Sequence, residues 1–287
     1  MGFFFAMNSP IGIFDSGYGG LTVLKSIKKL LPQYDYLYLG DNARAPYGSR
    51  SFDVVYQYTR EAIEYLFKQN CHLIILACNT ASAKALRTIQ QHDLIRTYPN
   101  RRVLGVLRPT TEEIGHMTKT GHVGVLGTSG TVKSNSYALE IGKFFPQIKV
   151  TQHSCPMWVP MVENNSFLDP GGQYFIQKNI EEIFEKDDQI DTLILACTHY
   201  PILKDSILKY LPNGVQLVEQ GDLVADKLDD YLKRHVGLAK KISSCGTLKL
   251  LTTENTQKFD HHLKLFYGES LKSTSIDLRK LSLNHLE

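Results

Sequence analysis

Short apolar runs alternate with segments of helical spacing along most of the chain. The first run, Ile11 to Phe14, leads through a glycine-rich turn into Leu21 to Leu31, where apolar residues recur with the period of a helix. Runs that begin at Leu73, His122 and Leu193 are each followed by a turn and a helical segment in the same way. Strands that alternate with helices are typical of an α/β fold with mainly parallel sheets, which is the fold class that we predict.

Two of these units look like copies of one another. LIILACNTASA (Leu73 to Ala83) and LILACTHYPIL (Leu193 to Leu203) are apolar runs that end in Ala-Cys and continue with small polar residues. The pattern places Cys78 and Cys197 at the carboxyl ends of buried strands, beside the first backbone N–H groups of a helix. Because those groups and the helix dipole favour negative charge, we expect each thiol to ionise more readily than a free cysteine.

A second pair of motifs repeats at a similar separation. IGIFDSGYG, which begins at Ile11, matches VGVLGTSGT, which begins at Val123, in its pattern of glycine, apolar and small polar residues. Two motif pairs at similar separations predict an internal duplication, and hence two pseudo-symmetric α/β domains with the site in the cleft between them. We assign residues 8–100 together with 214–287 to a first, discontinuous domain, and residues 101–213 to a second.

The candidate site lies at the carboxyl ends of the predicted strands, where open parallel sheets bind their ligands. Such ends are occupied by Asp15, Cys78, Thr128 and Cys197. We therefore expect these four side chains to open on one cleft between the domains. Asp15 is equally typical of a plain turn. The polar loop around Pro46-Tyr47-Gly48 is either a surface loop or a segment that covers the site, and both alternatives stay open.

Composition argues against several classes of protein. The chain has 287 residues, of which 43% are hydrophobic and 21% are charged, as in globular proteins that bury a core. A net charge of +3 gives no reason to expect a nucleic-acid partner. No apolar run approaches the ~18 residues of a membrane span, and the apolar stretch Gly2 to Met7 is too short for a signal peptide. We therefore expect neither nucleic acid nor a membrane as a partner.

The five cysteines are Cys71, Cys78, Cys155, Cys197 and Cys245. Their odd number and their wide spacing without a CxxC motif indicate neither a metal site nor a dense disulfide framework. A reducing, cytoplasmic location fits them best. We interpret Cys71 and Cys155 as structural and Cys245 as incidental, because none of the three repeats the context of the other two.

Six motifs carry a resemblance to a known family. They are, in chain order, DSGYGGLTVL, GDNARAPYGSRS, ACNTASA, GVLGTSGTV, CPMWVPMVE and LACTHYPIL. Together they resemble the glutamate racemases, cofactor-independent enzymes of bacterial cell-wall synthesis, over most of the chain from Ile11 to Thr253. The chain departs from the family at Asn42, where threonine is common, and at Arg108, where the family often has glutamate or another residue before proline.

The resemblance implies that the protein interconverts L-glutamate and D-glutamate without a cofactor or metal, supplies D-glutamate for peptidoglycan, and is a homodimer. In the family the two cysteines are the catalytic acid and base, which are Cys78 and Cys197 here. The positions that match the family's other site motifs are Asp15, Ser16, Tyr47, Gly48, Asn79, Thr80, Thr198 and His199. The resemblance also implies that Ser16 and the backbone at Tyr47 and Gly48 bind the distal carboxylate.

These residues suit that chemistry. Inversion of an α-carbon requires one proton to leave one face and another to arrive on the opposite face, which a thiolate and a thiol can do as a pair. His199 is placed to assist Cys197, and Asp15 to accept or relay a proton or to hold the substrate ammonium. The negative charge on the substrate carboxylate requires hydrogen-bond donors. Such donors are offered by Asn79, Thr80, Thr198 and the turn that contains Thr128 and Thr131.

Three alternatives stay open. The first is a racemase for another acidic amino acid such as aspartate, which a comparison of rates would separate. The second is a non-catalytic protein that binds a small anion with its glycine-rich turns alone, whose affinity would survive alkylation of the cysteines. The third is a redox pair, which would need the Cα atoms of Cys78 and Cys197 within about 7 Å of each other.

Overall fold

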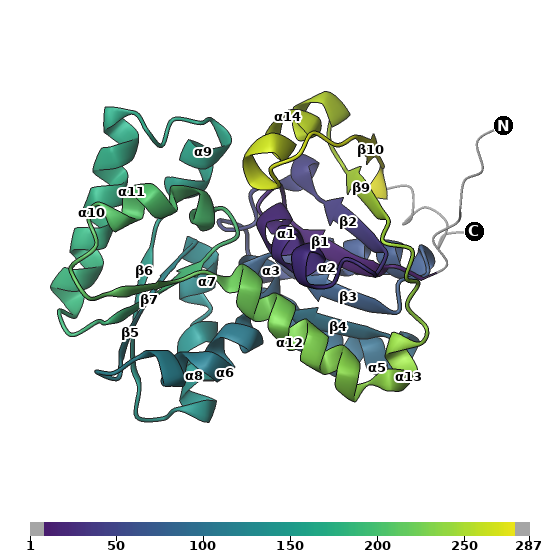
Figure 1. The fold of residues 1–287 in the computed structure, drawn as a ribbon, viewed down its shortest axis with the longest axis horizontal. Coiled ribbons are helices and arrows are strands. Elements are labelled where there is room, and N and C mark those ends of the chain that lie inside the picture. The colour runs from purple at the N-terminus through teal and green to yellow at the C-terminus, as the bar shows by residue number, and fades with distance from the viewer. Residues whose placement is uncertain (1–8, 279–287) are drawn as a thin grey trace.

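The computed structural model describes residues 9–278, which form two lobes side by side (Figure 1). The first lobe contains a six-stranded sheet and the second lobe a four-stranded sheet. The apolar stretch Gly2 to Met7 and the outer ends of the predicted first domain, at residues 8 and 279–287, lie outside the described residues. None of the helices in the described part of the chain is both long and apolar enough to cross a membrane.

The strands of the described chain are β1 (Ile11–Asp15), β2 (Tyr36–Gly40), β3 (Leu73–Leu76), β4 (Arg102–Gly105), β5 (His122–Gly127), β6 (Lys149–Ser154), β7 (Thr192–Ala196), β8 (Gln216–Val218), β9 (Leu248–Thr252) and β10 (Ser273–Ser275). The α-helices are α1 (Gly20–Leu30), α2 (Phe52–Lys68), α3 (Asn79–Lys84), α4 (Leu86–Thr88), α5 (Leu94–Thr97), α6 (Leu107–Met117), α7 (Ser129–Lys133), α8 (Ser136–Phe144), α9 (Trp158–Glu163), α10 (Pro170–Lys186), α11 (Lys204–Leu208), α12 (Gln220–Arg234), α13 (Val236–Ala239) and α14 (Thr256–Phe266). Two 3₁₀ turns and one π-helical turn complete the set: η1 (Asn42–Arg44), η3 (Tyr200–Leu203) and η2 (Ile89–Asp93).

The two sheets repeat one strand order. The first sheet runs β10-β9-β2-β1-β3-β4 and the second β6-β5-β7-β8, and every pair is parallel. The segment β2-β1-β3-β4 therefore corresponds strand for strand to β6-β5-β7-β8. The predicted fold class is confirmed, and the matching order supports the internal duplication.

Both faces of the first sheet are buried. Along β1, Ile11 and Ile13 pack with the α1 side chain Leu24, whereas Phe14 packs on the opposite face with Val55 of α2. Successive side chains of a strand point to opposite faces, so a strand covered on both sides must be apolar throughout. This explains why the sequence shows continuous apolar runs rather than an apolar–polar alternation.

The two sheets do not divide the chain at the predicted domain boundaries. They differ from the prediction at both places where the chain passes from one lobe to the other. Strand β4, which the prediction gave to the second domain, pairs with β3, and β8, which it gave to the first, pairs with β7. Each is the fourth strand of the shared order and lies beside a cysteine strand, so the chain leaves a lobe only after forming all four strands of that order. Residue 101, where the prediction began the second domain, directly precedes β4 of the first sheet. The division into domains stays a prediction, and we now propose 9–105 with 219–278 and 106–218.

Two elements had no counterpart in the pattern. Helix α9 contains Pro160, but a proline in the first turn removes only an N–H that has no helical partner. Its Trp158, Met161 and Val162 are buried at helical spacing. Strand β10 lies near the end of the described residues and pairs with β9 at the edge of the first sheet.

Candidate active site

The motif strands are neighbours within each sheet, so their carboxyl ends meet where the lobes face each other. Strand β1 pairs with β3, and β5 pairs with β7. Hydrogen bonds cross between the lobes here: the Thr198 hydroxyl donates to Asp15 Oδ1 at 3.3 Å, and the hydroxyl oxygens of Thr80 and Thr128 lie 2.9 Å apart. The structure thus brings together the strand ends that the sequence singled out.

Cys78 caps helix α3 with its sulfur. Its Sγ accepts the Ala81 N–H at 3.4 Å and lies 3.4 Å from the Ser16 hydroxyl, to which the thiol donates. Only 5% of the residue is exposed. Burial, reinforced by the charge of Asp15, raises the pKa of Cys78 to about 11, although the hydrogen bonds that Ser16 and Ala81 can donate to the thiolate act in the opposite direction.

Cys197 has a similar environment in the second lobe. It is 6% exposed, and burial raises the pKa of its thiol, with smaller contributions from the charges of Cys78 and Asp15. The backbone N–H of His199 hydrogen-bonds the sulfur and lowers the pKa, but by less than burial raises it. The expectation that both thiols ionise readily is therefore wrong for this structure. The helix starts are present, but desolvation where the lobes meet outweighs them.

Asp15 lies at the end of β1 beside the two thiols and has no exposed surface. Its carboxylate accepts the Gly17 N–H at 2.9 Å and the Thr198 hydroxyl, and burial raises its pKa. Asp15 is thus placed to hold the glycine-rich turn of the first lobe against Thr198 of the second.

The ring of His199 is held by a residue to which the sequence assigned no role. Its Nε2 lies 2.9 Å from Glu163 Oε1, while its Nδ1 is buried without a hydrogen-bond partner among the described residues. Burial alone would raise the pKa of Glu163, but the hydrogen bond and charge of His199 lower it overall. His262 of α14 donates from Nε2 to the Glu163 carbonyl at 3.0 Å, so this acid also links the two lobes.

Threonines and glycines form the other side of the interface. Thr128 caps α7, and its hydroxyl oxygen lies 3.1 Å from that of Thr131. The Gly130 N–H donates to the Gly48 carbonyl at 2.7 Å, which joins the loop of the first lobe to this turn of the second. A Cβ on Gly48 would lie 2.8 Å from the Thr128 Cβ, so only glycine permits this approach.

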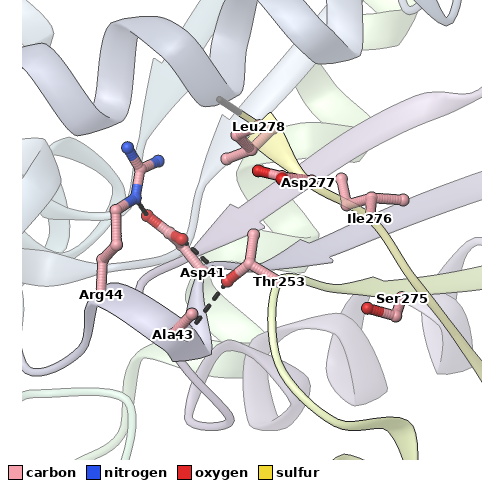
Figure 2. Close-up of a pocket in the computed structure, with 8 residues that line it drawn as sticks. All are labelled: Asp41, Ala43, Arg44, Thr253, Ser275, Ile276, Asp277 and Leu278. Carbon is pink, nitrogen blue, oxygen red and sulfur yellow. Dashed lines mark hydrogen bonds and ion pairs between the residues drawn. The ribbon is translucent and has the colours of Figure 1, made fainter. Parts of the chain in front are cut away.

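The side chain of Tyr47 makes its hydrogen bond inside the first lobe. It is 1% exposed, and its hydroxyl donates to Asp41 Oδ2 at 2.5 Å. Arg44 Nε and the Thr253 hydroxyl also donate to Asp41, at 2.7 and 2.9 Å (Figure 2). A cavity of about 540 Å³ opens beside these residues and Leu278. The loop therefore presents its backbone at Gly48, not the Tyr47 hydroxyl, to the second lobe.

Asn79 joins two residues that no motif in the sequence had selected. Its amide hydrogen-bonds the side chains of Gln220 and Tyr137, both fully or nearly buried. No group of three or more His, Cys, Asp or Glu side chains in residues 9–278 is arranged to hold a metal ion. Besides the two thiols, the polar groups at this interface include hydroxyls, amides, backbone N–H groups, the carboxylates of Asp15 and Glu163 and the ring of His199.

Comparison with known proteins identifies the family. A sequence model described as Asp/Glu/Hydantoin racemase matches residues 11–228, which is most of the chain. The chain belongs to this racemase family. The match spans both lobes and includes both cysteine strands.

Similar racemases are known in sequence and in structure. Glutamate racemase of Chlorobaculum parvum is 38% identical over 268 residues, 93% of this chain and 96% of that protein. The crystal structure of glutamate racemase isoform RacE1 from Bacillus anthracis has a TM-score of 0.85 at 33% identity, covering 95% of this racemase and 98% of that chain. Glutamate racemase of Francisella tularensis, crystallised with D-glutamate, has a TM-score of 0.84 at 30% identity, covering 95% and 99%.

Proposed function

We propose that this racemase interconverts L-glutamate and D-glutamate, with Cys78 and Cys197 as the two bases. The observation that carries the proposal is the equivalent position of the two thiols. Each follows the third strand of a shared four-strand order, one in each lobe, and their charges interact where the lobes meet. Two thiols related in this way can approach one carbon from opposite faces.

The proposed reaction has two proton transfers. The thiolate of one cysteine takes the α-proton, so that the C–H bond breaks, an S–H bond forms, and the electron pair stays on the substrate. The thiol of the other cysteine then gives its proton to the opposite face and becomes a thiolate. The cysteines exchange roles when the direction reverses.

The polar groups around the thiols supply binding and charge stabilisation. We assign the α-carboxylate to donors on Asn79, Thr80, Thr198, Thr128 and Thr131, and the distal carboxylate to Ser16 and the backbone at Gly48. Donors aimed at the carboxylate stabilise the charge that develops when the α-proton leaves. Glu163 orients His199 beside Cys197, and Asp15 holds Thr198.

Raised thiol pKa values predict a steep dependence on pH. The reactive form is the deprotonated thiol, and below its pKa the thiolate fraction falls about tenfold per pH unit. Since burial raises the pKa of Cys78 to about 11, kcat/KM should climb from about pH 7 to about pH 9 without reaching a plateau. Initial rates on both enantiomers, with circular dichroism at each pH as the control for folding, would measure this. A profile that is flat over that range would contradict the raised pKa.

The function itself is tested by proton exchange. The full-length protein, with no cofactor added, is incubated in heavy water with L-glutamate or D-glutamate, and deuterium at the α-carbon is followed together with optical rotation. We expect both enantiomers to convert and the product to carry solvent deuterium. The same assay with L- and D-aspartate should give much lower rates. If aspartate were converted as fast as glutamate or faster, glutamate would not be the preferred substrate. Absence of exchange with either amino acid would overturn the proposal.

The cellular setting forms part of the same proposal. The resemblance to enzymes of cell-wall synthesis supports a role in supplying D-glutamate for peptidoglycan. A cytoplasmic location fits the chemistry, because both thiols must stay reduced to act as acid and base. The family resemblance supports a homodimer, which light scattering of the purified protein would distinguish from a monomer.

A further inference from the structure

Three buried side chains form a closed ring of hydrogen bonds beside Cys78. Asn79 Nδ2 donates to Gln220 Oε1 at 2.7 Å, Gln220 Nε2 donates to the Tyr137 hydroxyl oxygen at 2.7 Å, and that hydroxyl donates to Asn79 Oδ1 at 2.6 Å. Exposed fractions are 2% for Asn79, 4% for Gln220 and 0% for Tyr137. Each member donates once and accepts once within the ring, and the Val106 carbonyl, which can only accept, requires the NH₂ group of Gln220 on its side, so together they fix which way both amides point.

The ring lies where the chain passes between the lobes. Gln220 begins α12, just after β8 completes the second sheet. Its Nε2 also lies 3.1 Å from the carbonyl of Val106 and 3.0 Å from the hydroxyl of Thr110. Val106 directly follows β4, the last strand of the first sheet before the chain enters the second lobe. The Gln220 side chain therefore links both segments that pass between the lobes to Asn79, the residue that follows Cys78.

Reversing any one amide would be costly. If the Asn79 amide were rotated by 180°, its Oδ1 would face Gln220 Oε1, and two acceptors would meet without a hydrogen. Its NH₂ group would face the Tyr137 hydroxyl, which would then lack an acceptor for its own proton. Buried polar groups left without partners cost about 1–3 kcal/mol each. The ring therefore holds Asn79 in one orientation and keeps the same amide N–H groups near the start of α3.

We propose that Gln220 and Tyr137 are positioning residues for racemisation, which orient the Asn79 amide and tie it to the two interlobe passages. This inference rests on the proposed function, in which Asn79 donates to the substrate carboxylate. Without the ring, Asn79 can turn its oxygen toward that carboxylate, and a stabilising donor becomes a repelling acceptor. The loss falls on the step in which charge develops, and so on kcat more than on KM.

The test compares two tyrosines that each lose one buried hydroxyl. Tyr137→Phe opens the ring, whereas the control Tyr36→Phe removes a hydroxyl that donates to the Leu31 carbonyl at 2.7 Å inside the first lobe. Both tyrosines are 0% exposed, so similar losses of thermal stability are expected. We expect Tyr137→Phe to lower kcat about 10- to 100-fold, as for other residues that orient a group at an active site, with KM changed much less. Tyr36→Phe should keep the kcat of the unaltered protein.

Substitutions at Gln220 separate positioning from folding. Gln220→Met keeps the length of the side chain without its hydrogen bonds and should lower kcat as Tyr137→Phe does. In Gln220→Glu the protonated carboxyl can still donate to Tyr137 and accept from Asn79, but the ionised form can only accept. Its kcat relative to the unaltered protein should therefore fall as pH rises and recover on return to low pH, which a purely structural defect would not do.

The outcomes distinguish the two proposals. If the unaltered protein racemises glutamate and folded Tyr137→Phe and Gln220→Glu retain its kcat at every pH, the positioning role is overturned while the proposed function stands. If the unaltered protein does not act on glutamate, the proposed function itself fails. Should Gln220→Met not fold, the other two variants still decide, because each changes the ring by a single atom or group.

Discussion

Replacing Cys78 or Cys197 by serine should lower kcat about 10²- to 10⁴-fold in both directions, the range lost with a positioned acid or base. A hydroxyl of similar size keeps the packing, but it ionises far less readily than a thiol and is a poor base. Either substitution leaves one face of the α-carbon without a proton donor or acceptor. Because each direction of the reaction uses both thiols, neither enantiomer should be spared.

The exposed Cys245 provides the matched control for this experiment. Cys245→Ser makes the same chemical change away from the interface and should leave kcat and KM unaltered. Racemisation would be followed by polarimetry or by an enantiomer-specific coupled assay, with thermal unfolding to confirm that each variant is folded. A Cys78→Ser or Cys197→Ser variant that retained substantial racemisation would refute the two-base scheme.

Gly19→Ala should have the second-largest effect. A Cβ at Gly19 would lie closer than 3.0 Å to the Thr198 hydroxyl oxygen and to His199 Nδ1, both from the opposite lobe. The added methyl must displace these side chains or hold the lobes apart. Misplacing catalytic groups by about 1 Å costs about 10²-fold in rate, so kcat/KM should fall by roughly that factor.

Gly142→Ala is the matched control for Gly19→Ala. Gly142 lies inside α8, and a Cβ there would have no heavy atom within 4 Å. Alanine in a helix interior is more favourable than glycine by roughly 0.5–1 kcal/mol, so this variant should be fully active and slightly more stable. If Gly19→Ala were as active as Gly142→Ala, the close approach of Gly19 to Thr198 and His199 would have no catalytic importance.

Local pattern was enough to predict the paired cysteine strands. Apolar runs ending in Ala-Cys mark buried strands, and their repetition indicated two matching sheets. Glycine-rich turns after strands placed Asp15 and Thr128 at the same interface. These features depend on neighbours in the sequence, which is why the strand–turn–helix units and the meeting of their ends were predictable.

Other features depend on contacts between distant segments. The spacing of His199 suggested that its ring assists Cys197, but the ring hydrogen-bonds Glu163 of α9, and the backbone N–H contacts the sulfur. Burial of the thiols depends on how the lobes close, so a helix start alone gave the wrong direction for their pKa. Gln220 and Tyr137 are joined to Asn79 only by the packing of the lobes, and no local signal could have selected them.

The shared strand order has a consequence for rates. L-glutamate and D-glutamate are mirror images with equal free energy, so their equilibrium constant is one and kcat/KM must be the same from either side. The lobes are nevertheless unequal beside the sulfur, since Thr80 stands two residues after Cys78 where His199 stands two residues after Cys197. Because of this inequality, kcat for L-glutamate can differ from kcat for D-glutamate, but KM must then differ by the same factor. The two enantiomers can therefore saturate the enzyme at different concentrations, but their kcat/KM values must be equal.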